Sequence, residues 1–126
     1  MNLTHISIIT EDVGRLRSFY YAVLQIEPSG EGAYVEFRTE TGALSLFSLE
    51  GQERLAPGSM QGASNRTVML EFHVEDVDKE YERLRQMDIE WVKPPTTQQW
   101  GNRSIYFRDP DGNLLNFYTR VDSEPA

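Results

Sequence analysis

The chain repeats itself, and this repeat constrains its fold more than any other feature. The segment Thr10-Glu11-Asp12-Val13 returns 64 positions later as Val74-Glu75-Asp76-Val77, each time between a strand-like and a helix-like stretch. A second segment, residues 37–47, returns 70 positions later as residues 107–117. Two matches in the same order indicate an internal duplication, which must be recognised before a fold is assigned.

Composition limits the class of protein. The 126 residues, of which 39% are hydrophobic and 25% charged, suit one ordinary soluble globular domain. A net charge of -8 disfavours nucleic acid as a partner; it either favours a cationic ligand or simply keeps the protein soluble. There is no apolar stretch of the roughly 20 residues that cross a bilayer, and no leader pattern follows Met1. We therefore expect a cytoplasmic protein with no membrane partner. The absence of cysteine excludes disulfides and thiolate sites.

The first copy has the pattern of a strand, a helix and two further strands. Residues 2–10 are rich in β-branched residues and alternate between two faces. Asp12 suits a helix N-cap, and apolar residues at helical spacing predict a helix from Val13 to about Gln25. Strands are predicted at 34–37 and 44–49, joined by the turn 39–42.

The second copy repeats this order. A strand is predicted at 67–74, with Met69, Glu71 and His73 on one face, and a helix runs from Val77 to about residue 87. A short strand at 90–92, a loop with two prolines and a hairpin at 104–119 follow. Residues 51–66 are punctuated by glycine, proline and serine and are predicted to link the copies, whereas 122–126 form a frayed tail.

Each module thus contains one helix and a small sheet with one uncovered face. Two such βαβββ modules, residues 1–50 and 67–121, predict a single α+β domain in which a curved mixed sheet surrounds a cleft and the helices lie outside. One strand of the first module, before Tyr34, has no clear signal.

These features resemble the vicinal oxygen chelate superfamily of glyoxalases, bleomycin-resistance proteins and extradiol dioxygenases. The resemblance covers nearly the whole chain. It is carried by His5 on the opening strand before Glu11-Asp12-Val13, by Ser18-Phe19-Tyr20 with Leu24, and by Trp100-Gly101-Asn102-Arg103 leading into residues 107–113. Family helices often end at glycine. This chain has Gln25 and Asp88 there, and aspartate adopts the left-handed conformation more readily than glutamine.

The resemblance also implies four metal-ligand positions, which the repeat offsets assign to His5, Leu46, Met69 and Asn116. One imidazole, one amide and two apolar side chains are too few donors for a divalent ion, so we expect no metal and no cofactor. A displaced site of His5, Glu71 and His73 is the alternative. Its weakness is the spacing, because alternate residues on a strand are roughly 6.5–7 Å apart, which puts His73 near the rim.

The same resemblance places a ligand-binding cleft between the modules. His5 is a general base, a ligand contact or a cleft histidine bonded to a neighbour such as Asn116, and Glu71 is the other catalytic candidate. Phe47 and Phe117 are predicted to occupy equivalent core positions, whereas Tyr34 is a further cleft candidate. The residues predicted to line the cleft are His5, Leu46, Met69, Glu71, Trp100, Asn116 and Tyr118.

Three functions follow from this pattern. The first is a metal-independent binding protein that sequesters an apolar or cationic small molecule, as in the bleomycin-resistance branch. The second is a lyase-type or dioxygenase-type enzyme with a non-standard site built on His5 and Glu71. The third is a domain that binds other proteins and has a vestigial cleft. The resemblance further implies a homodimer, with the modules pairing either within one chain or between two chains.

Overall fold

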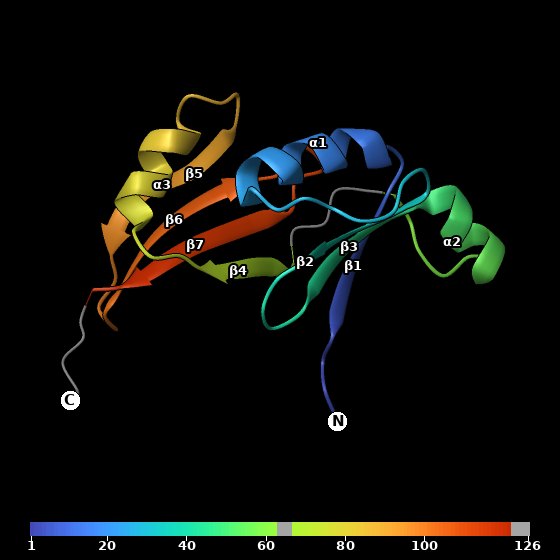
Figure 1. The fold of residues 1–126 in the computed structure, drawn as a ribbon, viewed down its shortest axis with the longest axis horizontal. Coiled ribbons are helices and arrows are strands. Elements are labelled where there is room, and N and C mark those ends of the chain that lie inside the picture. Colours follow the sequence, from blue (N-terminus) through green and yellow to red (C-terminus); the bar gives the residue numbers. More distant parts are fainter. Residues whose placement is uncertain (63–66, 122–126) are drawn as a thin grey trace. The chain divides into compact units, whose positions relative to one another are not determined.

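A computed structural model describes residues 1–62 and 67–121, and the chain divides into two compact units, Met1–Ala63 and Ser64–Ala126. The first unit contains β1 (His5–Thr10), α1 (Val13–Leu24), β2 (Tyr34–Arg38), β3 (Ala43–Ser48) and α2 (Leu49–Leu55) (Figure 1). The second contains β4 (Met69–His73), α3 (Val77–Leu84), β5 (Glu90–Thr97), β6 (Asn102–Arg108) and β7 (Leu114–Arg120). The predicted α+β class is confirmed. The predicted tail, 122–126, and the last part of the predicted linker, 63–66, lie outside the described residues.

The first unit is a mixed three-stranded sheet with α1 on one face. The strand order is β1-β3-β2, with β1 parallel and β2 antiparallel to β3. Asp12 caps α1 by accepting a hydrogen bond from the Arg15 N–H at 3.0 Å. The helix buries an apolar stripe against the sheet, where the Tyr20 and Phe37 ring centroids are 6.2 Å apart. The core residues of this layer are Leu16, Tyr20, Val23, Val35, Phe37, Leu44 and Leu46.

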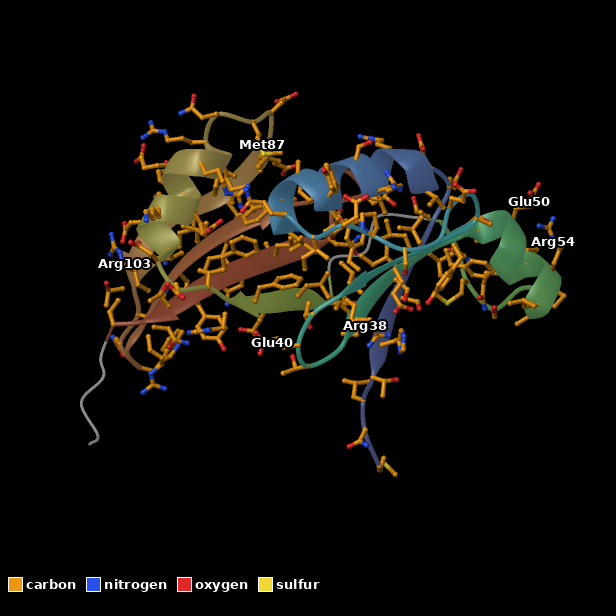
Figure 2. The ribbon with its side chains drawn as sticks, viewed as in Figure 1. Arg38, Glu40, Glu50, Arg54, Met87 and Arg103 are labelled. Carbon is orange, nitrogen blue, oxygen red and sulfur yellow. The ribbon has the colours of Figure 1, made fainter. Side chains whose placement is uncertain are left out.

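The second unit is a four-stranded mixed sheet in the order β4-β7-β6-β5, with α3 packed on one face. Asp76 caps α3 through the Lys79 N–H at 3.2 Å, as Asp12 caps α1. Arg103 of β6 is labelled in Figure 2. Its guanidinium donates to both Asp78 oxygens of α3, at 2.8 and 3.0 Å, and thereby lowers the pKa of this carboxyl group. The core residues here are Leu70, Val77, Leu84, Ile105, Phe107, Leu115 and Phe117.

The predicted linker and the predicted proline loop are both partly regular structure. Residues 49–55 form α2, whose N-cap Ser48 accepts a hydrogen bond from the Gly51 N–H at 2.9 Å. Strand β5 continues through Pro94 and Pro95 to Thr97. Proline is tolerated there because β5 is an edge strand and its register with β6 shifts between Lys93 and Thr96. Before Tyr34, the poorly signalled strand is reduced to one bridge between Ser29 and Glu36.

Helices α1 and α3 end differently from what the resemblance led us to expect for Gln25 and Asp88. Gln25 adopts the left-handed conformation, with φ of 57°, and its N–H donates to the Tyr21 carbonyl. It is the only non-glycine residue with positive φ among the described residues, so Asp88 does not share this conformation. Instead, the chain after α3 forms a tighter turn, in which residues three apart are bonded: the Met87 N–H donates to the Leu84 carbonyl at 2.9 Å. No helix in the described part of the chain is long and apolar enough to cross a membrane.

A difference in turn length shifts the register between the two copies. The turn between β2 and β3 spans residues 39–42, whereas the one between β6 and β7 spans 109–113 and is one residue longer. The extra residue, Asn113, is held by Asp109, whose Oδ1 and Oδ2 accept from its backbone and side-chain N–H groups, each at 2.9 Å. The offset of 70 positions is therefore valid before the turn and becomes 71 after it.

The last strand of each module must be realigned accordingly. His5 pairs with Ala43 and Met69 pairs with Leu114, so Ser45, not Leu46, is the counterpart of Asn116. A shift of one residue moves a side chain to the opposite face of a sheet. The prediction that Leu46 lines a cleft is wrong, because Leu46 is 0% exposed and is paired with Val35 on the α1 side.

The same one-residue shift places Phe47 and Phe117 on different faces of their sheets. Phe117 lies in the core, and its counterpart there is Leu46. Phe47 instead points to the face opposite α1, where its ring contacts Tyr34 with centroids 6.2 Å apart. The prediction that these residues are equivalent is therefore wrong.

Replacing Leu46 tests this register. We expect Leu46→Ala to lower the free energy of unfolding by about 2–5 kcal/mol, because it leaves a cavity in a packed layer. Met69→Ala is the control, since Met69 is 40% exposed and its truncation should cost far less. Urea denaturation of both variants measures the difference. Equal, small losses would place Leu46 on an open surface and contradict the register.

Candidate functional site

Each sheet has one face that is not packed under α1 or α3, and polar side chains gather there. In the first unit, β2 presents Tyr34, Glu36 and Arg38 on this face, because Val35 and Phe37 point to α1. The register brings Ser45 and Phe47 of β3 and His5 of β1 to the same side. We call this surface the first polar face. Helix α2 adjoins it, since a Cβ on Gly51 would lie 2.6 Å from Phe47 Cζ.

Glu36 is the centre of a hydrogen-bonded cluster on the first polar face. Its Oε1 lies 2.9 Å from Tyr34 Oη and 3.2 Å from His5 Nε2. Its Oε2 accepts from Arg38 Nη2, and Arg38 comes from the lower end of β2 in Figure 2. The Tyr34 hydroxyl also lies 2.9 Å from Ser45 Oγ. These contacts join all three strands of the sheet.

The environment keeps Glu36 ionised. Its hydrogen bond from Tyr34 is the main reason that its pKa is lowered, followed by the hydrogen bond from Arg38; the His5 contact contributes less, and partial burial opposes the effect. An ionised carboxylate only accepts hydrogen bonds, which fixes the direction of its neighbours. Tyr34 donates to Glu36, and Ser45 therefore donates to Tyr34.

His5 is oriented by the same argument. Its Nε2 must carry a proton to donate to Glu36, so Arg38 Nη2, which lies 3.5 Å from this atom, is a second donor and makes no hydrogen bond with it. When the ring is neutral, Nδ1 is the acceptor, and it lies 2.9 Å from the Thr4 hydroxyl. The carboxylate thus holds the imidazole in one tautomer with its basic nitrogen at Nδ1.

The structure gives His5 other partners than the sequence suggested. The prediction named Asn116 as a neighbour and Glu71 as a catalytic partner, but within its own unit His5 is bonded to Thr4 and Glu36. Glu36 and Arg38 were missed. The alternation of Tyr34, Glu36 and Arg38 along a strand with buried Val35 and Phe37 was the available signal.

The second polar face lies on the corresponding side of the second sheet. Glu71 of β4 and Tyr106 of β6 flank Asn116 of β7 in register, and Asn116 Nδ2 donates to Glu71 Oε1 at 3.0 Å. Asn116 is 4% exposed, yet its Oδ1 accepts no hydrogen bond within the described residues. A buried acceptor without a donor costs about 1–3 kcal/mol, so this oxygen requires an explanation.

The remaining predicted residues border this face or lie apart from it. His73 and Tyr118 are the next pair along the strands, with ring centroids 5.4 Å apart, and Met69 stands at the start of β4. Trp100 is 64% exposed in the turn between β5 and β6. The second polar face therefore brings together Glu71, Asn116 and Tyr118, whereas His5 belongs to the first unit.

Comparison with known proteins places this geometry in a family. Residues 2–117 match the model of the Glyoxalase/Bleomycin resistance protein/Dioxygenase superfamily. The chain belongs to this superfamily. The relatives include the uncharacterized protein YraH of Bacillus subtilis (strain 168), 31% identical over 128 aligned positions, covering 94% of this chain and 98% of YraH. The fosfomycin resistance protein FosX of Listeria innocua is 24% identical and covers 92% of this chain and 87% of FosX.

Solved structures of the superfamily agree. A glyoxalase/bleomycin resistance protein/dioxygenase from Nocardioides has a TM-score of 0.82 and 26% identity, covering 100% of this chain and 88% of its own. A family enzyme from Burkholderia phytofirmans PsJN has a TM-score of 0.85 at 17% identity, covering 96% and 100%, and supports the fold alone. The resemblance to the vicinal oxygen chelate superfamily is confirmed.

The metal-ligand positions that the resemblance implies do not carry a suitable set of donors in this chain. After realignment, the four implied positions are His5, Ser45, Met69 and Asn116, which supply one imidazole, one hydroxyl, one thioether and one amide. This set contains no carboxylate and does not fit a divalent ion. Glu36 stands beside His5 but is already paired with the Arg38 cation. Among residues 1–62 and 67–121, no group of three or more His, Asp or Glu side chains is arranged to hold a metal.

The Glu36 cluster predicts a particular pH dependence of stability. Because the folded-state pKa of Glu36 is lowered, its stabilising contribution is complete above the ordinary value of 4.5 and is lost as pH falls through the lowered pKa. We expect Glu36→Gln to be less stable than the unmodified protein at pH 7, with a difference that shrinks below about pH 4.5. Urea denaturation at several pH values measures it. Glu40→Gln, in the exposed β2–β3 turn, is the control, and a difference for Glu36→Gln that stays constant with pH would contradict the assignment.

Proposed function

We propose that this protein is a metal-independent small-molecule-binding protein of the glyoxalase/bleomycin-resistance type, which sequesters an apolar or cationic ligand in the cytoplasm as a homodimer. The observation that carries the proposal is the contrast between the two faces of each sheet. One face is a filled core under a helix, whereas the other presents aromatic rings and polar groups with a donor set unsuited to a dication.

The chemistry of the two polar faces supports a ligand with an apolar or aromatic body. Tyr34 is 41% exposed and packs edge-on against Phe47 on the first polar face. On the second, the His73 and Tyr118 rings contact each other at one end of β4, and the exposed Met69 stands at its other end. Aromatic rings and methionine adapt to varied flat ligands and need few directional contacts.

The name of one relative points in the same direction. FosX is called a fosfomycin resistance protein, and resistance to a drug is an action on a small molecule. At 24% identity this likeness supports the class of ligand, a small molecule, and leaves the compound open.

Binding without metal is the first test. We expect at least one member of a panel of aromatic cations, neutral aromatics and aromatic anions to bind saturably by isothermal titration calorimetry, with the same affinity after dialysis against EDTA. Mass spectrometry should recover the bound compound unchanged, and analytical ultracentrifugation of the same sample should give a dimer. Absence of binding across the panel, or binding that disappears with EDTA, would contradict the proposal.

The His5 arrangement favours one other function, a metal-independent enzyme in which this imidazole is a general base. In this function Glu36, and not Glu71, is the partner of His5. Glu36 holds the ring and would stabilise the imidazolium formed when Nδ1 takes a proton. Recovery of a chemically altered compound in the experiment above would establish this function in place of sequestration.

The tautomer of His5 can be measured directly. We expect ¹⁵N NMR of the imidazole above its titration range to show the proton on Nε2, because the Glu36 carboxylate accepts it. Glu36→Gln should give a mixture of tautomers, whereas Glu40→Gln should leave the spectrum unchanged. A proton on Nδ1 in the unmodified protein would remove the basis for the general-base assignment.

A further inference from the structure

The two carboxylates of the polar faces differ in what neutralises them. Glu36 has Arg38 and His5 against its oxygens. Glu71 receives a single neutral hydrogen bond, from Asn116 Nδ2, and forms no ion pair with any residue in the described parts of the chain. Glu71 is also exposed, and its second oxygen, Oε2, takes part in no hydrogen bond or ion pair within the described residues. The second polar face therefore offers an acceptor that lacks a cation.

Asn116 adds an acceptor of its own to the same row. Its amide is oriented by Glu71, because turning the amide round would set Oδ1 against the carboxylate, and two acceptors repel. In this orientation Oδ1 is buried and receives no hydrogen bond from the described residues. The cross-strand row Glu71–Asn116–Tyr106–Lys93 thus carries two neighbouring oxygen acceptors at its β4–β7 end, and its cation, Lys93, stands at the far end beyond Tyr106.

The neighbours of this row are aromatic. Tyr106 stands in register with Asn116 on one side, and the His73 and Tyr118 rings form the next row along β4 and β7. The cationic side chains on this side of the other strands are Lys93, Arg108 and Arg120. Arg108 is engaged by the Gly112 carbonyl and by Glu90, and none of the three forms an ion pair with Glu71 among the described residues. A planar cation has rings to stack on and a carboxylate to pair with.

We propose that Glu71 and Asn116 form the recognition point for an amidinium or guanidinium group carried on an aromatic or apolar body. A planar amidinium presents parallel N–H donors that match a carboxylate, which a point-like ammonium does not. The group takes the place of Asn116 Nδ2 at Glu71 with one N–H, and the amide then turns so that Oδ1 accepts the other. The acceptor repulsion that opposed this turn is removed, because a donor group now separates the two oxygens. This inference rests on the proposed function, because it names the ligand class for a protein that binds without metal.

Three matched probes test it: benzamidine, its neutral analogue benzamide and the anionic benzoate. We expect benzamidine to bind about tenfold or more tightly than benzamide, in line with the greater strength of charge-assisted hydrogen bonds, and benzoate to bind most weakly. Glu71→Gln should abolish this preference while preserving the fold, since the substitution is isosteric at an exposed site. Glu75→Gln, just beyond the end of β4, is the control that keeps the preference. In the unmodified protein, the side-chain amide signals of Asn116 should shift in the NMR spectrum when benzamidine is added.

The outcomes separate this inference from the proposed function. Equal binding of benzamide and benzamidine, or tighter binding of benzoate, would overturn the inference and leave a small-molecule-binding protein. A preference for benzamidine that survives Glu71→Gln, or that leaves the Asn116 amide signals unmoved, would place the cation site elsewhere and also overturn it. Absence of binding by all three probes together with the rest of the aromatic panel would overturn both.

Discussion

The alternation of side chains along each strand, counted from the turn that precedes it, determines which residues reach the polar face of each sheet. Adjacent residues point to opposite faces, so the length of one turn decides whether a serine or a leucine reaches the polar face. In the first module the four-residue turn before β3 sends Ser45 to that face and Leu46 beneath α1. The chemistry of the site is a consequence of this placement.

The two modules have diverged from one plan into electrostatically different surfaces. In the first, Glu36 is bonded to Tyr34, His5 and Arg38, and the cluster is satisfied within its own sheet. In the second, among the residues that the structure describes, the Glu71 carboxylate has only the Asn116 amide as a partner, and that amide retains an acceptor without a donor. Since the first cluster is internally paired and the second is not, an incoming cation gains more by meeting Glu71 than by competing for Glu36.

Much of the fold could be predicted because it depends on local signals. Asp12 and Asp76 cap their helices as expected, and the Asp109–Gly112 turn closes a hairpin. Leu46 could not be placed, because the inserted Asn113 changes the repeat offset after the turn and a sequence repeat does not locate a one-residue insertion. Glu36 was missed as the partner of His5 because it comes from a strand 31 residues further along the chain. Gln25 shows that the path of the chain after a helix, and not intrinsic preference alone, decides which residue takes a left-handed conformation.

The side chains placed by this register do not suit a divalent ion. Elemental analysis of the protein as purified, by inductively coupled plasma mass spectrometry, measures this. We expect far less than one equivalent of zinc, nickel, manganese or iron per chain, with no difference between the unmodified protein and His5→Ala. A stoichiometric transition metal that is lost in His5→Ala would contradict it and would make a metal-dependent enzyme the better description.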